Sequence, residues 1–128
     1  NRLEPYVRFA RRVTKQRRRM RSLVRDLRES GARVAAYGAS TKGNVLLQHC
    51  EFGPDDLEFV IEVNEDKFGC FTPGTDIPIV SEREGFARDP DYLLVLPWHF
   101  RSGILAREVD YIRQGGRLIF PLPEIEIA

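Results

Sequence analysis

The residue types best suited to binding a ligand lie in one glycine-bearing turn, residues 37–44, with the sequence Tyr-Gly-Ala-Ser-Thr-Lys-Gly-Asn. Such a turn between a strand and a helix exposes backbone N–H groups at the positive end of the helix, where phosphate or another anion is stabilised. Hydroxyl and ammonium side chains add further donors. A tight turn with a purely structural role is the alternative. For the anion or nucleotide site, the predicted substrate-binding residues are Gly38, Ser40, Thr41, Lys42 and Asn44.

This turn matches neither of the standard glycine-rich nucleotide motifs. Gly38 and Gly43 have the spacing of a P-loop, but Asn44 and Val45 stand where that motif requires Lys and Ser or Thr. The dinucleotide fingerprint requires a second glycine where Ser40 stands. The missing fingerprint argues against a free-standing nucleotide-binding oxidoreductase, which is kept as an alternative.

Further polar candidates follow the next expected strand. Glu62 comes 24 residues after Gly38, near the position at which an acid binds ribose hydroxyls in dinucleotide folds, and Asn64 offers a similar contact. A surface acid at a strand end is the alternative for Glu62. Lys67 lies in a long loop over 64–78, and long loops inside compact domains are commonly functional. We predict that Glu62, Asn64 and Lys67 contact the substrate.

The segment 97–101, Pro-Trp-His-Phe-Arg, follows a strongly apolar strand. Histidine titrates near neutral pH and can act as an acid or a base. His99 has no visible partner in the sequence, so we expect it to hydrogen-bond the loop or the ligand and at most to assist a reaction. Trp98 is expected to contact the ligand beside it. No catalytic residue is otherwise predicted in this chain.

The spacing of apolar residues predicts strands that alternate with helices. An apolar stripe with helical periodicity runs through residues 5–30, and Gly31 suits the end of that helix. The other expected elements are strands over 33–37, 57–63, 77–80, 91–96 and 117–120, and helices over 44–50, 82–86 and 101–114. Pro121 and Pro123 are expected to stop any continuation of the last strand.

This alternation predicts an α/β fold: a Rossmann-like, mostly parallel sheet of about five strands, flanked by helices and preceded by a long N-terminal helix. A doubly wound sheet binds ligands beyond the carboxyl ends of its strands, where the loops 38–43, 63–76 and 97–100 are expected. The 128 residues suffice for one core. We expect an amphipathic linker helix over 1–30, packed on a single domain over 31–128.

Charge is distributed unevenly along the chain. The net charge is +1, but residues 1–30 carry a net charge of +8 and the remaining residues −7. The basic helix face has three interpretations: a solvated surface, a surface against another domain, or a nucleic-acid-binding surface. Nucleic acid is the least favoured, because no aromatic or glycine pattern of RNA-binding modules accompanies the basic residues.

The cysteines and the hydropathy indicate a protein without metal or membrane. Cys50 and Cys70 form no CxxC pair and match no common zinc spacing with the two histidines, so we expect buried or partly buried free thiols. Reduced thiols suit a cytoplasmic protein. No apolar run approaches the roughly 20 residues of a membrane span, and no signal peptide is expected. The chain starts at Asn1, and we expect a fragment of a larger protein.

Five blocks of residues follow one another along the chain: 35–44, 62–67, 73–79, 94–101 and 115–123. Together they resemble one family: the C-terminal domains of S-adenosylmethionine-dependent C-methyltransferases, including those that methylate nucleotide-linked deoxysugars. The resemblance covers about residues 3–123. One departure is Glu62, where the family pattern has aspartate, which puts a direct copy of that contact in doubt.

The resemblance implies a parent enzyme of three parts. An N-terminal domain binds zinc, a middle domain binds S-adenosylmethionine and holds most of the acid–base residues, and the Rossmann-like C-terminal domain helps to hold the nucleotide-sugar. We therefore expect this chain to bind neither cofactor, to position a nucleotide-linked sugar, to contact the S-adenosylmethionine-binding domain of the same parent chain, and to be inactive alone. A basic-helix module for nucleic acid is the second alternative.

Overall fold

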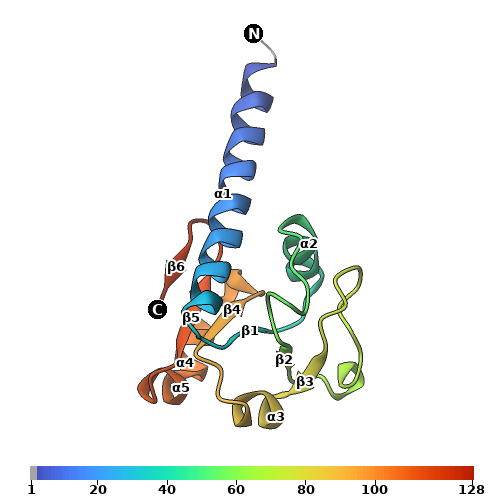
Figure 1. The fold of residues 1–128 in the computed structure, drawn as a ribbon, viewed down its shortest axis with the longest axis vertical. Helices are drawn as coiled ribbons and strands as arrows, with labels where there is room; N and C mark the ends of the chain where they lie inside the picture. Colours follow the sequence, from blue (N-terminus) through green and yellow to red (C-terminus); the bar gives the residue numbers. More distant parts are fainter. Residues whose placement is uncertain (1–2) are drawn as a thin grey trace.

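The computed structural model describes residues 3–128, in which six strands form one sheet in the order β3-β2-β1-β4-β5-β6 (Figure 1). All neighbouring strands are parallel except β5 and β6, which are antiparallel. The predicted α/β fold with a mostly parallel sheet is confirmed. The strands are β1 (Val34–Tyr37), β2 (Val60–Glu62), β3 (Ile79–Ser81), β4 (Tyr92–Val95), β5 (Arg117–Phe120) and β6 (Glu126–Ile127).

The direction in which the chain adds strands reverses between β1 and β4. Strands β2 and β3 lie on one side of β1, and the chain then returns to place β4 and β5 on the other side. Ala36 is accordingly paired with both Val60 and Leu94. Open α/β sheets bind ligands at such a switch point, outside the carboxyl ends of the strands. The loops that follow β1, β2 and β4 begin at this edge, as predicted.

Helices cover both faces of the sheet and create two apolar clusters. On one face lie α1 (Glu4–Glu29) and α2 (Thr41–His49), which contribute Met20, Val24, Leu46 and Leu47 to the first cluster. On the other face, α3 (Glu82–Ala87), α4 (Arg101–Arg107) and α5 (Val109–Arg113) pack on the second cluster. The strands between them are almost wholly buried, as expected for a parallel sheet that is covered on both faces.

The second half of α1 packs on the sheet, and the first half extends beyond it (Figure 1). Met20 and Val24 are fully buried, whereas Val7 is 45% exposed. Arg21 donates to the carbonyls of Cys50 and Glu51 at the end of α2, and Arg28 donates to the carbonyl of Asp56. Part of the basic face therefore binds the domain itself, because guanidinium groups satisfy carbonyls at a helix C-terminus. The predicted apolar stripe includes Tyr6 and Phe9, whose side chains lie outside the described part of the chain.

Several predicted boundaries were wrong. The helix expected over 44–50 begins three residues earlier, because the Ser40 side chain caps it. The strand expected over 57–63 is limited to Val60–Glu62. The single helix expected over 101–114 is two helices, because the backbone leaves helical geometry at Glu108, whose side chain turns to a buried partner.

One additional strand and one cysteine also differ from prediction. β5 ends at Phe120, directly before Pro121, as predicted, but the chain then turns back and forms β6, which pairs antiparallel with β5, for example Ile127 with Ile119. The prediction of buried thiols holds for Cys50 but is wrong for Cys70, which is exposed. The Cys70 backbone is bonded to Lys67 and Ile79, and this leaves its side chain outside the core. No helix within residues 3–128 has the length and hydropathy to cross a membrane.

Candidate functional site

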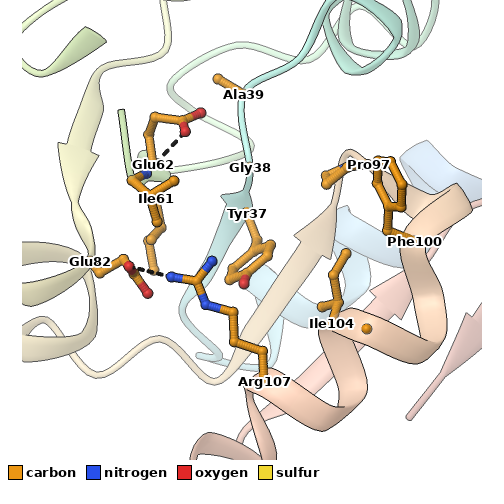
Figure 2. A pocket seen from close by; sticks show the side chains of 12 residues that line it. Tyr37, Gly38, Ala39, Ile61, Glu62, Glu82, Pro97, Phe100, Ile104 and Arg107 are labelled. Atoms are coloured by element: carbon orange, nitrogen blue, oxygen red, sulfur yellow. Dashed lines mark hydrogen bonds and ion pairs between the residues drawn. The ribbon is translucent and has the colours of Figure 1, made fainter. Parts of the chain in front are cut away.

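A cavity of about 270 Å³ lies at the switch point, beyond the carboxyl ends of β1, β2 and β4 (Figure 2). Its walls come from the ends of β1 and β2, from the segments after these strands and β4, from Glu82 at the start of α3, and from Gly103, Ile104 and Arg107 of α4. Two of the ten predicted substrate-binding residues, Gly38 and Glu62, line it. The twelve lining residues are Tyr37, Gly38, Ala39, Ile61, Glu62, Val63, Glu82, Pro97, Phe100, Gly103, Ile104 and Arg107.

Gly38 brings two of these loops into contact. Its φ of +78° lies in the left-handed region, which side-chain-bearing residues rarely adopt. A Cβ at this position would stand 2.8 Å from Cδ of Pro97, a separation that real Cβ atoms do not show. The conformation and the close approach both require glycine, so Gly38 sets the shape of the cavity mouth.

Glu62 places a carboxylate at the cavity wall, and one of its oxygens accepts no hydrogen bond from residues 3–128. The side chain is only 8% exposed. Its Oε1 accepts from the backbone N–H groups of Val63 at 2.9 Å and Asn64 at 3.2 Å, so the local turn fixes its orientation. Its Oε2 is buried and has no hydrogen-bond partner within the described residues. The nearest cation is Nζ of Lys67 at 4.0 Å, too far for a hydrogen bond.

A second buried carboxylate lies behind the cavity. Tyr37, at the end of β1, donates its hydroxyl to Oε2 of Glu108 at 2.5 Å. Burial and this bond to a carboxylate raise the pKa of Tyr37 well above its usual value, so the phenol stays protonated. Glu108 is 8% exposed and occupies the break between α4 and α5. The break directs its side chain inward to Tyr37, 71 residues earlier in the chain.

Arg107 closes one side of the cavity. Its Nη2 lies 2.6 Å from Oε1 of Glu82 at the start of α3 (Figure 2). Its Nε lies 3.7 Å from Oε2 of Glu108. The guanidinium thus ties α4 to α3 across the cavity wall, with half of its side chain still exposed. A guanidinium carries five N–H donors, so this arrangement leaves donors for a ligand.

The turn that the sequence analysis singled out becomes the N-terminus of α2. Oγ of Ser40 accepts from the N–H of Gly43 at 3.0 Å, and the Ser40 carbonyl accepts from the N–H of Asn44 at 2.8 Å. Two of the amides predicted to meet an anion are therefore bonded within the helix start. Thr41 and Lys42 are exposed. Oδ1 of Asn44 is buried without a hydrogen-bond partner in the described part of the chain.

The other predicted residues lie around the cavity but do not line it. Lys67 donates to the carbonyl of Ala39 at 3.3 Å, which ties the loop after β2 to the loop after β1. The Asn64 side chain caps the short 3-10 helix η1 (Glu65–Lys67). Trp98 is half-buried against both apolar clusters. His99 is exposed and contacts the rings of Trp98 and Phe100 within η2 (Trp98–Phe100).

Four polar residues in or behind the cavity wall were not predicted from the sequence: Tyr37, Glu82, Arg107 and Glu108. Glu82 and Arg107 are 25 residues apart, and Tyr37 and Glu108 are 71 apart, so no local spacing relates them. The sequence offers one signal for this site, because Arg107 and Glu108 lie next to the apolar residues of the helix predicted over 101–114. Their positions in the sequence do not show whether their side chains face the sheet or the solvent.

Two features of the described residues bear on metal and cofactor binding. Within residues 3–128, no three His, Cys, Asp or Glu side chains come together as a metal site. The turn after β1 has Ser40 where the dinucleotide fingerprint has its second glycine, and Oγ of Ser40 accepts the hydrogen bond of the Gly43 N–H. A larger groove of about 820 Å³ lies between α1, α2 and residues 122–125, and none of the predicted site residues lines it.

Two comparisons relate the chain to known proteins. A family model described as the C-methyltransferase C-terminal domain matches residues 1–123. The C-methyltransferase NovU of Streptomyces niveus is 39% identical over 119 residues, which is 93% of this chain. The matched part is 28% of NovU, so the chain spans little more than a quarter of the length of that relative.

Proposed function

The chain belongs to the family of C-methyltransferase C-terminal domains, and on that premise we propose that it binds and orients the substrate, a nucleotide-linked sugar, for methylation by the rest of its parent enzyme. The observation that carries the proposal is the cavity at the switch point together with Glu62, whose buried Oε2 accepts no hydrogen bond from residues 3–128. A polar atom buried without a partner is costly, and a ligand donor would recover that cost.

In this proposal the chain positions the substrate and does not itself make or break bonds. S-adenosylmethionine, held by another domain of the parent, supplies the methyl group, and zinc also belongs to another domain. The residues of this chain hold the sugar so that its reacting carbon stays in line with the methyl donor, and such positioning lowers a barrier by several kcal/mol. Without the partner domain, the 128-residue chain is inactive. The proposal carries with it a cytoplasmic location.

The start of α2 is the second contact of the proposed site. Its free N–H groups and the exposed Lys42 and Thr41 side chains would meet the phosphates, while Lys67 lies between this turn and Glu62. His99 would donate a hydrogen bond at the same edge. These roles continue the predictions made from the sequence.

The proposed partner of α1 is the S-adenosylmethionine-binding domain of the same parent chain. The first half of α1 extends away from the sheet (Figure 1). It carries the exposed residues Val7, Arg11 and Arg12. Apolar and basic groups together suit an acidic protein surface. Nucleic acid is less favoured, because Arg17, Arg21 and Arg28 are engaged by the domain itself.

Calorimetric titration with thymidine or uridine diphosphate-sugars tests the proposal. We expect weak binding by this chain and no methyl transfer when S-adenosylmethionine is added. Absence of binding, together with Ser40, Thr41 and His99 substitutions that leave the parent enzyme unaffected, would remove the substrate-binding role. Binding of duplex or single-stranded DNA with a strong salt dependence through α1 would favour the nucleic-acid alternative instead.

A further inference from the structure

Resting on the proposed function, we propose that the partner domain of α1 docks by one amphipathic helix, whose apolar stripe is flanked by carboxylates. The docking site is the groove of about 820 Å³ between α1, α2 and residues 122–125, called the basic groove below. It lies along the part of α1 that leaves the sheet (Figure 1). It shares no lining residue with the cavity at the switch point.

The floor of the basic groove continues the apolar core. Met20 and Leu46 line the groove and belong to the first apolar cluster, and Ile125 packs against the same cluster. Val13, Leu122 and Ile125 are only half-buried. Apolar surface that joins the core and still meets water is stabilised when a partner covers it. The floor of the groove therefore supplies affinity for an apolar stripe.

Hydrogen bonds fix the walls of the basic groove relative to α1. Nε2 of Gln16 donates to the Pro121 carbonyl at 2.7 Å, which ties α1 to the segment after β5. Arg21 ties α1 to the end of α2 through the carbonyls of Cys50 and Glu51. A surface that is formed before binding loses little conformational entropy when a partner arrives. The groove is therefore suited to a rigid element such as a helix.

The spacing of residues along α1 also favours a helix as the occupant. Val13, Gln16 and Met20, which line the groove, are separated by three and then four residues, over about two turns. The same spacing continues to Leu23 and Leu27, which pack against the first apolar cluster. A seam of this period receives the side chains of a second helix that lies nearly alongside the first. Beyond Met20 the sheet covers this seam, and at Val13 a partner helix can cover it.

The charge of the basic groove selects an acidic partner. Its four cations are Arg12, Lys15, Arg17 and Arg19, and its carboxylate is Glu124. Arg17 lies 3.4 Å from Oε1 of Glu51, and the other three cations form no ion pair within residues 3–128. Charged residues that flank a helix seam determine which helix pairs with it. Exposed ion pairs add little affinity, so carboxylates of the partner would determine the choice of helix and its orientation.

The same charges disfavour a second copy of the chain. Two α1 helices paired along this seam would place like charges together, because Arg12 and Arg19 both flank it. A helix with acidic flanks must come from another part of the parent enzyme or from another protein. The chain matches 28% of the length of NovU, so most of that relative lies outside the matched part. We assign the helix to the parent enzyme, since a covalent link gives it a high effective concentration at the groove.

Hydrogen–deuterium exchange of the intact parent enzyme and of this chain alone tests the docking. Amides of a helix segment without tertiary contacts exchange fast, and packing slows them. We expect peptides covering residues 10–20 to exchange at least about tenfold more slowly in the parent than in the chain alone. Equal rates in the two proteins would overturn the proposal. Slow exchange in the chain alone, caused by dimers in sedimentation velocity or by added DNA, would overturn it as well.

Charge reversal locates the contact in the parent enzyme. Arg12→Glu and Arg19→Glu should each speed exchange of these peptides about threefold or more, because they oppose carboxylates to carboxylates. Arg18→Glu is the matched control, since Arg18 is exposed, does not line the groove and should leave the exchange unchanged. Equal effects of Arg19→Glu and Arg18→Glu would show that the partner surface is not acidic. Thermal denaturation of each variant of the isolated chain checks that its fold is kept.

The outcomes separate the docking from the proposed function. If the peptides exchange equally in both proteins while calorimetry shows nucleotide-sugar binding by this chain, the docking alone is wrong. If the peptides are protected in the parent and respond to Arg19→Glu while no nucleotide-sugar binds, the docking stands as a contact between domains and the substrate-binding role falls.

Discussion

The two faces of the sheet are covered in different ways. On the α1 and α2 face, Met20, Val24 and Leu47 are fully buried. Two arginines of α1 donate to backbone carbonyls after α2, Arg21 to Cys50 and Arg28 to Asp56. On the α3–α5 face, the apolar cluster ends in a group of ionisable side chains, with Tyr37 bonded to Glu108 and Arg107 bridging to Glu82.

This difference separates stability from ligand binding. Both faces bury apolar surface, which is the main favourable contribution to folding. The α3–α5 face also holds Glu108, one of two buried carboxylates in the described part of the chain, and buried carboxylates add little net stability and are costly when unpaired. The charged face is also the one that borders the cavity. The comparison predicts that changes in the buried apolar residues of the first face alter stability alone, whereas changes in the residues of the second face that border the cavity alter stability and binding together.

The largest effect is expected on the apolar face. Leu47→Ala removes a fully buried side chain and leaves a cavity, so the free energy of unfolding should fall by about 3 kcal/mol. Urea denaturation measures the loss, and nucleotide-sugar affinity should not change under folding conditions. Val45→Ala, at an exposed position of the same helix, is the control and should change stability by about 0.5 kcal/mol or less. A large change in affinity for Leu47→Ala would end the proposed separation.

Two tyrosines on the second face sharpen the comparison. Tyr37→Phe deprives the Glu108 carboxylate of a hydrogen bond and should lower the free energy of unfolding by about 2 kcal/mol. Tyr111→Phe loses a bond to the uncharged carbonyl of Pro90, 2.7 Å away, and should cost about 1 kcal/mol. Denaturant titrations of both variants measure these losses. Only Tyr37→Phe should also weaken ligand binding, and equal effects of the two variants on binding would contradict the assignment of the cavity.

The dependence of stability on alkaline pH tests the burial of a thiol, Cys50, on the apolar face. Burial raises the pKa of the Cys50 thiol from its ordinary 9.0 to about 11. Between these values the native thiol keeps its proton while the unfolded chain loses it, so the unfolded state binds fewer protons and stability falls as pH rises. The contribution of Cys50 should reach about 1.4 kcal/mol near pH 10 and should be absent in Cys50→Ala, which keeps the smaller loss from Tyr37 and Tyr111, whose pKa values are also raised. Denaturation at pH 8 and pH 10 measures it, and exposed Cys70→Ala should keep the full pH dependence.

The smallest effect concerns the arginines of α1. Arg21→Gln loses hydrogen bonds to the carbonyls of Cys50, at 2.5 Å, and Glu51, at 3.1 Å. The free energy of unfolding should fall by about 1 kcal/mol. Arg25→Gln, whose side chain is 65% exposed, should change it by less than about 0.5 kcal/mol. Equal stabilities of the two variants in thermal denaturation would show that the basic face is solvated throughout.

Local sequence patterns determined the class of the fold and the edge at which the ligand site forms. Apolar runs such as 91–96 and the helical stripe of α1 persist over enough residues to define strands and helices. Alternation of these elements leads to parallel pairing, and parallel strands place their following loops at one edge. Gly38 and Glu62 were therefore predicted at the cavity from their positions after two strands.

Only the tertiary structure decided which other side chains join them. Arg107 and Glu82 meet because α4 and α3 pack on the same face, and Tyr37 meets Glu108 because the helix expected over 101–114 breaks between α4 and α5. β6 likewise exists only because the chain folds back on β5. These contacts join residues distant in the chain, and their formation depends on packing between elements. Periodicity within one segment carries no information about such packing, so the sequence determined the elements and the structure determined the site.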